Sequence, residues 1–224
     1  IEKISLTASG GPFYRLPIKK FNKISVSQAL KHPNWKMGKK ISIDSATMMN
    51  KVFEVIEAKR IFNLKNSQLE ILIHPNSYIH AIIKFKNGMI KLIAHETNMK
   101  IPIINSLNNK FINTEKYKIL NLNLLNNLNL NKISNIRYPM INILNLIGEK
   151  QSLFETVLVT ANDELVNLFL DNKIQFVDIY KKLSKFIKLD KFITYRTKKP
   201  HNIEDIIKLN DYVKTYIRLN FKSL

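Results

Sequence analysis

The stretch from Ser42 to Glu57 constrains the fold of this chain more than any other part of the sequence. It contains no Gly or Pro, and neither residue follows it as far as Phe62. Asp44 or Ser45 can accept hydrogen bonds from the free amides of a first helical turn. The pattern therefore predicts one helix that begins at Asp44 or Ser45 and ends near Phe62.

The predicted helix carries one polar face that is rich in functional groups. At about 100° per residue, Asn50, Glu54 and Glu57 fall within one narrow arc, and Lys51 lies at its edge. A helix N-terminus beside Ser45, with Asn50 and Lys51 within reach, is suited to bind an anion such as a phosphate. Glu54, one turn further along, is suited to bind a cation.

The composition excludes several classes of site. The chain has 224 residues, enough for a sizeable core in one or two domains. It contains no cysteine, which excludes disulfides, thiolate catalysis and cysteine-ligated zinc and favours a hard cation held by oxygen or histidine. No apolar run approaches the roughly 18 residues that span a bilayer, and the N-terminus has no signal-peptide pattern, so we expect no membrane partner.

The net charge of +19, from 36 Lys and Arg against 17 Asp and Glu, is the feature that favours another class of function. A basic chain with scattered aromatic residues is compatible with an RNA-binding module, whose affinity would fall steeply with salt. The lysines are spread along the whole chain, and Asn and Ile are abundant, so the residue usage of an AT-rich genome explains the charge more simply. We therefore expect no nucleic-acid partner, although a positive field still attracts anionic ligands.

Further motifs lie on either side of the polar helix. Ser-Gly-Gly-Pro-Phe begins at Ser9, and His-Pro-Asn-Trp-Lys-Met-Gly begins at His32 and leads into Ser-Ile-Asp-Ser-Ala-Thr-Met-Met-Asn-Lys. Ile-His-Pro follows at Ile73, with His80 beyond it. In this order the motifs closely resemble those of the 1-deoxy-D-xylulose 5-phosphate reductoisomerases. The resemblance is strong over residues 1–107 and weaker over the remainder.

This resemblance implies a reaction, its cofactors and a fold. The family rearranges 1-deoxy-D-xylulose 5-phosphate and reduces the product with NADPH to 2-C-methyl-D-erythritol 4-phosphate for isoprenoid biosynthesis. A divalent cation, Mn²⁺ or Mg²⁺ with Co²⁺ as a further alternative, acts as Lewis acid. The implied fold class is α+β, with a catalytic domain (1–107) of a small mixed sheet, an active-site flap and helices, an Asn-rich connecting segment (108–139) and a C-terminal α-helical bundle (140–224).

The resemblance also assigns roles to individual positions. The substrate-binding residues are Ser9, His32, Ser45, Asn50, Lys51 and Glu54. Glu54 is in addition a carboxylate ligand of the metal, and Gly38 contacts the cofactor. Trp35 and Met37 belong to a flap that closes over the substrate. Glu57 maps near the metal, with a less defined role.

The chain departs from the family pattern in two respects. Val52 and Phe53 stand where the family has Gly and Leu, which alters the packing one turn before Glu54. The family's nucleotide-binding domain and its Asp-Ser-Glu metal segment have no counterpart here, so we expect an N-terminal half before Ile1 and a chain that is incomplete and inactive alone. The implied partners are the sugar-phosphate substrate, that N-terminal half and a second copy in a homodimer. A non-catalytic remnant of the enzyme stays an alternative. The implied location is the cytoplasm if the source is bacterial and a plastid-type organelle if it is eukaryotic.

The remaining sequence predicts shorter elements around this helix. We expect strands at 4–7, 69–74, 79–85 and 89–93, a capped helix at 25–29, a strand in the centre of 120–130, and helices at 141–149, 160–170, 178–187 and 203–221. Asn87-Gly88 predicts a hairpin with a type I′ turn. Asp163 and Glu164 are expected in a first-turn cap. His74 and His80, on apolar strands, are expected to be structural residues.

Overall fold

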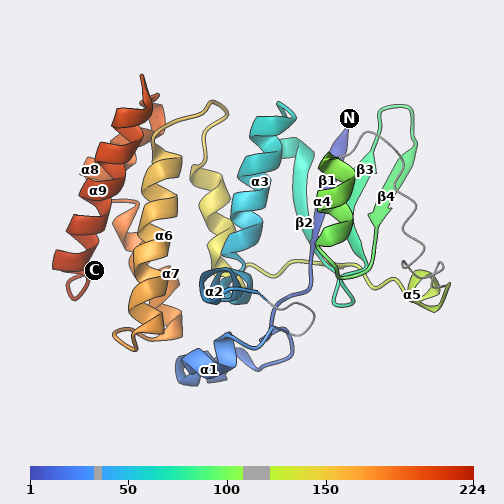
Figure 1. Cartoon of the computed structure of the whole chain (residues 1–224), viewed down its shortest axis with the longest axis horizontal. Helices are drawn as coiled ribbons and strands as arrows, with labels where there is room; N and C mark the ends of the chain where they lie inside the picture. Colours follow the sequence, from blue (N-terminus) through green and yellow to red (C-terminus); the bar gives the residue numbers. More distant parts are fainter. Residues whose placement is uncertain (33–36, 108–121) are drawn as a thin grey trace. The chain divides into compact units, whose positions relative to one another are not determined.

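The structure is a computed structural model that describes residues 1–32, 37–107 and 122–224. Its fold is mixed α+β, as the sequence predicts (Figure 1). The described residues form two compact units that interleave along the chain: unit 1 comprises 1–10 and 67–133, and unit 2 comprises 11–66 and 134–224. The sequential division at residues 107 and 139 stays a prediction.

Unit 1 is built on a five-stranded sheet with the order β4-β3-β1-β2-β5. Its strands are β1 (Lys3–Ala8), β2 (Leu69–Ile73), β3 (Ile79–Lys84), β4 (Ile90–Ala94) and β5 (Asn131–Lys132). Only β1 and β2 pair in parallel, and the other neighbours are antiparallel. The central strands bury Ile4, Ile71, Ile73 and Ile79, whereas every residue of the edge strand β4 is exposed.

The hairpin predicted between β3 and β4 is confirmed, but its turn type is wrong. A type I′ turn needs positive φ at both central residues. In this turn only Gly88 has a positive φ, at 85°. The same unit contains the helices α4 (Lys100–Leu107) and α5 (Leu122–Asn126). The strand predicted within 120–130 is therefore wrong where α5 forms, and residues 108–121 lie outside the described residues.

Unit 2 is helical. It contains α1 (Val26–Ala29), α2 (Lys39–Thr47), α3 (Met49–Ile61), α6 (Phe154–Leu170), α7 (Phe176–Phe186), α8 (Asp190–Ile193) and α9 (Ile203–Asn220). Four 3₁₀ helices complete the list of helices in the described ranges: η1 (Ile18–Lys23), η2 (Asn66–Gln68), η3 (Pro139–Leu146) and η4 (Thr194–Thr197). The predicted cap of α1 is confirmed, because the Ser25 and Gln28 side chains form a reciprocal capping box.

The single helix predicted from Asp44 or Ser45 to Phe62 is wrong, because the chain forms two helices there. Met48 adopts the left-handed conformation (φ 71°, ψ 10°) and separates α2 from α3. Asp44 and Ser45 lie inside the second half of α2 and cap nothing. Local sequence gave no sign of the break, since Met is an unusual residue in this conformation and the stretch has neither Gly nor Pro.

Helix α6 begins earlier than predicted, at Phe154 rather than Thr160. Asp163 and Glu164 are consequently in the middle of α6, and their predicted role in a first-turn cap is wrong. They point to different elements: Asp163 pairs with Lys40 of α2, and Glu164 accepts two hydrogen bonds from Arg218 of α9 at 2.7 and 3.0 Å. The position of each carboxylate is therefore explained by an ion pair with another helix and not by the start of α6.

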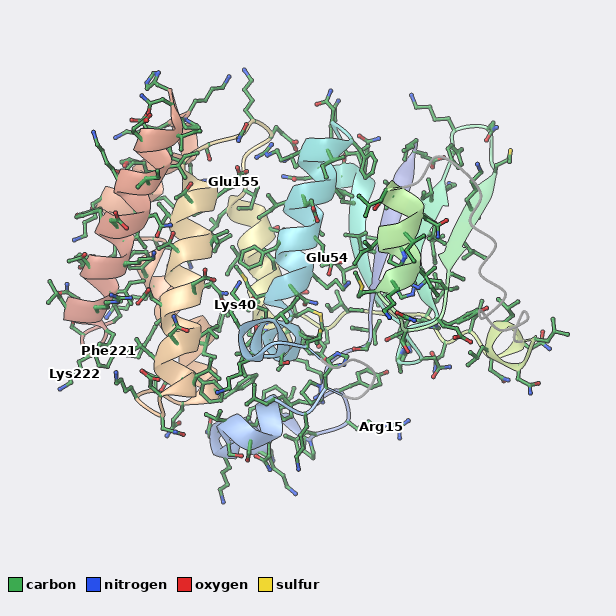
Figure 2. All side chains as sticks on the ribbon, viewed as in Figure 1. Arg15, Lys40, Glu54, Glu155, Phe221 and Lys222 are labelled. Atoms are coloured by element: carbon green, nitrogen blue, oxygen red, sulfur yellow. The ribbon has the colours of Figure 1, made fainter. Side chains whose placement is uncertain are left out.

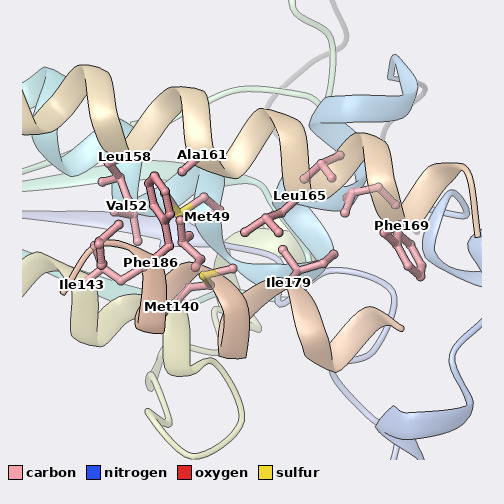
Figure 3. Close-up of a cluster of buried hydrophobic side chains, with 14 of the residues drawn as sticks. Met49, Val52, Met140, Ile143, Leu158, Ala161, Leu165, Phe169, Ile179 and Phe186 are labelled. Atoms are coloured by element: carbon pink, nitrogen blue, oxygen red, sulfur yellow. The ribbon is translucent and has the colours of Figure 1, made fainter. Parts of the chain in front are cut away.

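The core of unit 2 surrounds α6 (Figure 3). This helix contacts α2, α7, α8 and α9, and it runs beside α9 in Figure 1. Leu158, Leu165 and Ile179 are fully buried in this core together with Met49 and Val52 of α3. Each such side chain stabilises the fold by about 1.5–3 kcal/mol relative to its exposed state. Within the described ranges no helix combines the length and apolar character needed to cross a membrane.

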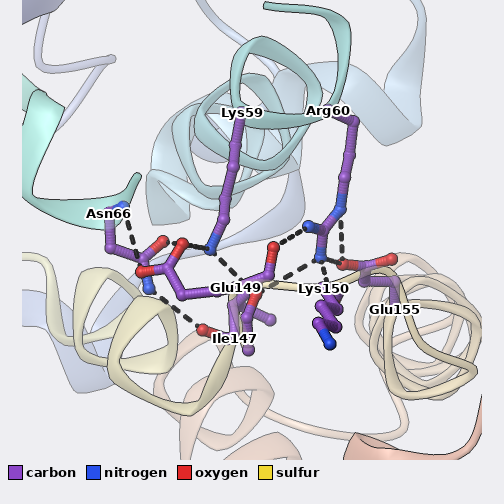
Figure 4. Close-up of polar contacts among 8 residues, drawn as sticks. Lys59, Arg60, Asn66, Ile147, Glu149, Lys150 and Glu155 are labelled. Atoms are coloured by element: carbon purple, nitrogen blue, oxygen red, sulfur yellow. Dashed lines mark hydrogen bonds and ion pairs between the residues drawn. The ribbon is translucent and has the colours of Figure 1, made fainter. Parts of the chain in front are cut away.

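A polar clamp fixes the C-terminal end of α3 (Figure 4). The Lys59 side chain is only 1% exposed, and its ammonium donates to Asn66 Oδ1 at 2.6 Å and to the Gly148 carbonyl at 2.8 Å while pairing with Glu149 at 2.8 Å. Arg60 donates to the side chain of Glu155 and to neighbouring backbone carbonyls. Two adjacent cations thus tie α3 to the segment that leads into α6.

We expect Lys59→Met to lower the free energy of unfolding by about 1–3 kcal/mol, because the variant fills about the same space but removes the buried ammonium that joins Asn66, Gly148 and Glu149. Chemical denaturation of the chain measures this change. Lys181→Met on the exposed face of α7 is the matched control and should stay within about 0.5 kcal/mol of wild type. Equal effects of the two substitutions would contradict a stabilising role of the clamp.

Candidate functional site

Most of the predicted site residues lie on α2 and α3 in unit 2 or just before them (Figure 2). Ser45 is in the last turn of α2, and its backbone carbonyl accepts the hydrogen bond from Met48 N–H at 3.2 Å. Asn50, Lys51 and Glu54 are in the first two turns of α3. The break at Met48 therefore stands between the predicted hydroxyl ligand and the three other polar side chains.

The loop at Gly11 packs directly against the end of α2. Gly11 has φ +66°, and a Cβ atom placed on it would lie 2.9 Å from the Ser45 carbonyl oxygen. Both the backbone conformation and the close approach require glycine here. This contact brings the second Gly of the Ser-Gly-Gly-Pro-Phe motif against the segment that contains Ser45. Ser9 itself belongs to unit 1.

Two of the amides at the start of α3 are already engaged. Met49 N–H donates to Thr47 Oγ1 at 3.4 Å, and Lys51 N–H donates to Asn50 Oδ1 at 2.9 Å. The predicted anion site used free helix-start amides. In the structure an anion at this position meets chiefly side-chain donors, the Asn50 amide and the Lys51 ammonium.

Lys51 and Glu54 form an ion pair across one turn of α3, with Lys51 Nζ 2.6 Å from Glu54 Oε2. The Lys51 side chain is 14% exposed and that of Glu54 is 39% exposed. An ion pair between residues one turn apart on a helix, with one partner in contact with solvent, contributes little to stability, typically below about 1 kcal/mol. Separation of the two groups therefore costs little free energy. Lys51 can then bind an anionic ligand and Glu54 a cation.

The described residues offer only part of a metal site. Glu54 is a half-exposed carboxylate, a suitable ligand for Mg²⁺ or Mn²⁺. Among the described residues, however, no group of three or more His, Cys, Asp or Glu side chains is placed to hold a metal ion. A cation at this position would take one ligand from Glu54 and the others from elsewhere. His74 and His80 instead contact the backbone carbonyls of Asn129 and His95, as expected of structural residues.

The segment before α2 contains the other predicted residues. Trp35 lies outside the described residues. Met37 is half-buried. Burial lowers the pKa of His32, which favours the neutral imidazole. Gly38 is exposed and has an ordinary extended backbone, and no atom of the described residues lies within 4 Å of a Cβ placed on it. Among the described residues, neither backbone conformation nor packing accounts for glycine at this position, and a ligand has room to approach it closely.

Sequence reasoning missed Lys40 and Asn162 as neighbours of the site. Lys40 pairs with Asp44 in the same helix and with Asp163 of α6, and Asn162 donates to Asp44. The Lys40 and Asp44 spacing of four residues is a recognisable helix-pair signal. The contacts with α6 connect residues more than 110 positions apart and have no local signal.

A cleft of about 830 Å³ lies elsewhere in unit 2. It is lined by residues around η4 and α9, including Lys199, Lys208 and Tyr212. None of the predicted site residues lines it.

Comparison with known proteins identifies the class of protein. Residues 1–62 match the family model described as the 1-deoxy-D-xylulose 5-phosphate reductoisomerase C-terminal domain, and residues 95–216 match the DXP reductoisomerase C-terminal domain. The matched regions are parts of a reductoisomerase, an α+β protein with a mixed sheet and helices. This chain belongs to the 1-deoxy-D-xylulose 5-phosphate reductoisomerase family, as its motifs predict.

Individual relatives agree with this assignment. The reductoisomerase of Pelagibacter ubique is 60% identical over 96% of this chain and 56% of its own length, and that of Persephonella marina is 42% identical over 92% and 54%. A crystal structure of DOX-P reductoisomerase in complex with NADPH, fosmidomycin and magnesium superposes with a TM-score of 0.90 at 32% identity, covering 99% of this chain and 55% of that one. The Zymomonas mobilis enzyme in complex with NADPH gives 0.84 at 30% identity, covering 100% and 56%. The chain thus spans little more than half the length of these relatives.

We expect Gly11→Ala to destabilise the chain by about 1–3 kcal/mol more than Gly88→Ala. Both positions have positive φ, so both variants carry the backbone strain, but a Cβ at Gly88 meets nothing within 4 Å. The difference between the two unfolding free energies therefore measures the contact with Ser45. Equal losses on denaturation would show that α2 can move away from the loop without cost.

Proposed function

We propose that this chain forms the substrate-binding, metal-binding and C-terminal part of an enzyme that converts 1-deoxy-D-xylulose 5-phosphate to 2-C-methyl-D-erythritol 4-phosphate with NADPH. The observation that carries the proposal is the polar face of α3, with Lys51 beside Glu54, in a chain 60% identical to a reductoisomerase over 219 residues. The curated relatives are bacterial, and we place the reaction in the cytoplasm.

The phosphate of the substrate binds to Ser45, Asn50 and Lys51 in this proposal, and Ser9 and His32 are further contacts with the substrate. Hydroxyl, amide and ammonium groups all donate to phosphate oxygens, and charge-assisted hydrogen bonds from Lys51 are the strongest of these. The phosphate does not react. Its binding energy serves to orient the carbon atoms that do.

Glu54 supplies one carboxylate to a divalent cation, with magnesium as the ion named for a solved family structure. When bound, such a cation acts as Lewis acid toward the oxygens of the substrate. In the absence of ligands, the charges of Lys51 and Glu54 neutralise each other. Lys51 exchanges the Glu54 carboxylate for phosphate, and Glu54 exchanges the Lys51 ammonium for the cation.

Gly38 faces the nicotinamide cofactor in this proposal, and Met37 with Trp35 covers the bound substrate. The open space at the Gly38 Cβ position supports the first assignment, because a flat cofactor ring can approach a backbone without a side chain. The neutral state of His32 suits a hydrogen-bonding contact with a sugar hydroxyl rather than an ion pair with phosphate.

A chimera tests the function directly. This chain replaces the matched segment of the Pelagibacter ubique reductoisomerase, and NADPH oxidation with 1-deoxy-D-xylulose 5-phosphate is followed. We expect the chimera to be active and Glu54→Gln to reduce kcat by at least about 100-fold with weaker Mg²⁺ activation, because the amide cannot replace the charge that a hard cation requires. NADPH affinity should be unchanged. Glu204→Gln, in the exposed first turn of α9, is the matched control and should have no effect.

Two outcomes would contradict the proposal at different points. A chimera that folds and binds NADPH but never turns over the substrate would reject the function of the chain. An active chimera in which Glu54→Gln retains wild-type rate and Mg²⁺ dependence would reject only the metal role, and Glu54 would then be no more than the surface partner of Lys51.

We further propose that the chain assembles as a homodimer through the β4 edge of the sheet. Every β4 residue is exposed, and Ile90, Leu92 and Ile93 are 60%, 51% and 46% exposed. An exposed apolar edge strand is prone to pair with another chain and is rarely left uncovered in a monomer. A second copy of the same surface is a partner of matching chemistry.

The double variant Ile90→Lys/Leu92→Lys should convert the dimer to a monomer, because two ammonium groups on one face of β4 oppose burial. Light scattering coupled to size-exclusion chromatography measures the mass. The control Ile207→Lys changes a residue that is 53% exposed on α9 and should leave the dimer intact. A monomeric wild-type chain, or a double variant that stays dimeric, would contradict this interface.

A further inference from the structure

A charged cluster joins α2 to α6 beside the proposed site. It consists of Lys40, Asp44, Asn162 and Asp163 and is called the Lys40 cluster below. Lys40 Nζ lies 2.8 Å from Asp44 Oδ2 and 2.9 Å from Asp163 Oδ1. Asn162 Nδ2 donates to the other oxygen, Asp44 Oδ1, at 2.8 Å. Both carboxylate oxygens of Asp44 thus have partners, one within α2 and one on α6.

The cluster is an expensive arrangement for stability alone. The Asp44 side chain is 3% exposed, and Asn162 is completely buried. Burial raises the pKa of Asp44, against the opposing effect of hydrogen bonds from Lys40 and Asn162. Burial also lowers the pKa of Lys40, but Asp44 and Asp163 outweigh it and raise this pKa overall. Lys40 and Asp163 keep 42% and 41% of their side chains exposed, so the buried charge of the cluster is that of Asp44. Burial of this carboxylate costs free energy, which its partners on α2 and α6 offset, and the same partners hold it in place.

The geometry that the cluster fixes is that of the two helices on either side of Met48. On α2, Asp44 is next to Ser45, and its backbone carbonyl accepts a hydrogen bond from Thr47 Oγ1 at 3.2 Å, one residue before the break. On α3, the Phe53 ring lies 5.1 Å from Lys40 Nζ, an ammonium-to-ring contact. Phe53 directly precedes Glu54. Lys40 therefore contacts α2, α3 and α6 at once.

We propose that the Lys40 cluster is a positioning device that sets the angle between α2 and α3, so that Ser45 on one helix and Asn50 and Lys51 on the other converge on the same phosphate. This inference rests on the proposed function. Neither Lys40 nor Asp44 touches the substrate in it. They act through the two helices, because a displacement of about 1 Å in a binding group is enough to cost a large factor in rate.

The test uses the chimera described above and compares two buried carboxylates. Asp44 contacts Asn162 of α6, and Glu164 lies on α6 itself, two residues further along. Asp44→Asn removes the charge from the cluster. Glu164→Gln removes the charge from the Arg218 contact, which joins α6 to α9 and not to the site helices. Both carboxylates are buried, with 3% and 7% of the side chain exposed, so both variants are expected to lower the melting temperature. Only Asp44→Asn should also reduce kcat/KM, by about ten-fold or more and mainly through KM.

A double variant separates an effect on the position of α2 and α3 from an effect on the stability of the fold. Lys40→Met leaves the Asp44 carboxylate buried without its cation, whereas Lys40→Met/Asp44→Asn removes both charges and should recover much of the lost melting temperature. In a positioning role the double variant keeps the raised KM. Binding of the substrate analogue fosmidomycin, measured by calorimetry, should weaken in parallel, which gives a readout independent of turnover.

The outcomes are distinguishable. Wild-type KM and inhibitor affinity in Asp44→Asn, or equal losses in Asp44→Asn and Glu164→Gln, would overturn the inference while leaving the proposed function intact. Recovery of KM together with melting temperature in the double variant would also overturn it, since the cluster would then be a stability element only. An inactive wild-type chimera would count against the proposed function, and the inhibitor-binding comparison would still decide the role of the cluster.

Discussion

The left-handed backbone of Met48 is the constraint on which the arrangement of the site depends. A non-glycine residue in this conformation costs on the order of 1 kcal/mol, and here the side chain is 1% exposed in the core. The burial of Met48, together with that of Met49 and Val52, offsets that cost. One continuous helix would carry the α3 residues along the axis of α2. The break instead ends α2 at the loop that contains Gly11 and starts α3 in a new direction.

The parts of the fold that were predictable are those fixed by local physical chemistry. The hairpin at Asn87-Gly88 needs only a residue that tolerates positive φ between two β-forming runs, and the short helix after Ser25 needs only its capping box. The break at Met48 and the true start of α6 at Phe154 are set by packing between segments far apart in sequence. Periodicity cannot report these features, since neither side of the break contains a Gly or Pro that would end a helix.

The candidate site shows the same division. The spacing of Asn50, Lys51 and Glu54 on one helix was readable, and α3 contains all three. The partners that decide how these groups behave were only partly readable: the Lys51–Glu54 pair follows from helical spacing, but Arg60 binds Glu155 across 95 positions. Asp163 and Glu164 were misassigned for this reason. A pair of adjacent carboxylates has the same local pattern whether it caps a helix or joins two others.

Internal compensation of charge also explains how a chain with a net charge of +19 places these cations close together. Each functional carboxylate and cation on α2 and α3 has an opposite partner within the same unit: Lys51 with Glu54, and Lys40 with Asp44 and Asp163. The two pairs differ in the burial of their carboxylates: the Glu54 side chain is 39% exposed, whereas that of Asp44 is 3% exposed. Glu54 can leave Lys51 for a ligand while its charge stays in contact with solvent, whereas separation of the Lys40 cluster would leave the Asp44 carboxylate buried and unpaired. A site that binds an anion and a cation at neighbouring positions needs both kinds of interaction. The Lys51–Glu54 pair exchanges partners with the ligands, and the Lys40 cluster keeps α2 and α3 in a fixed position during the exchange.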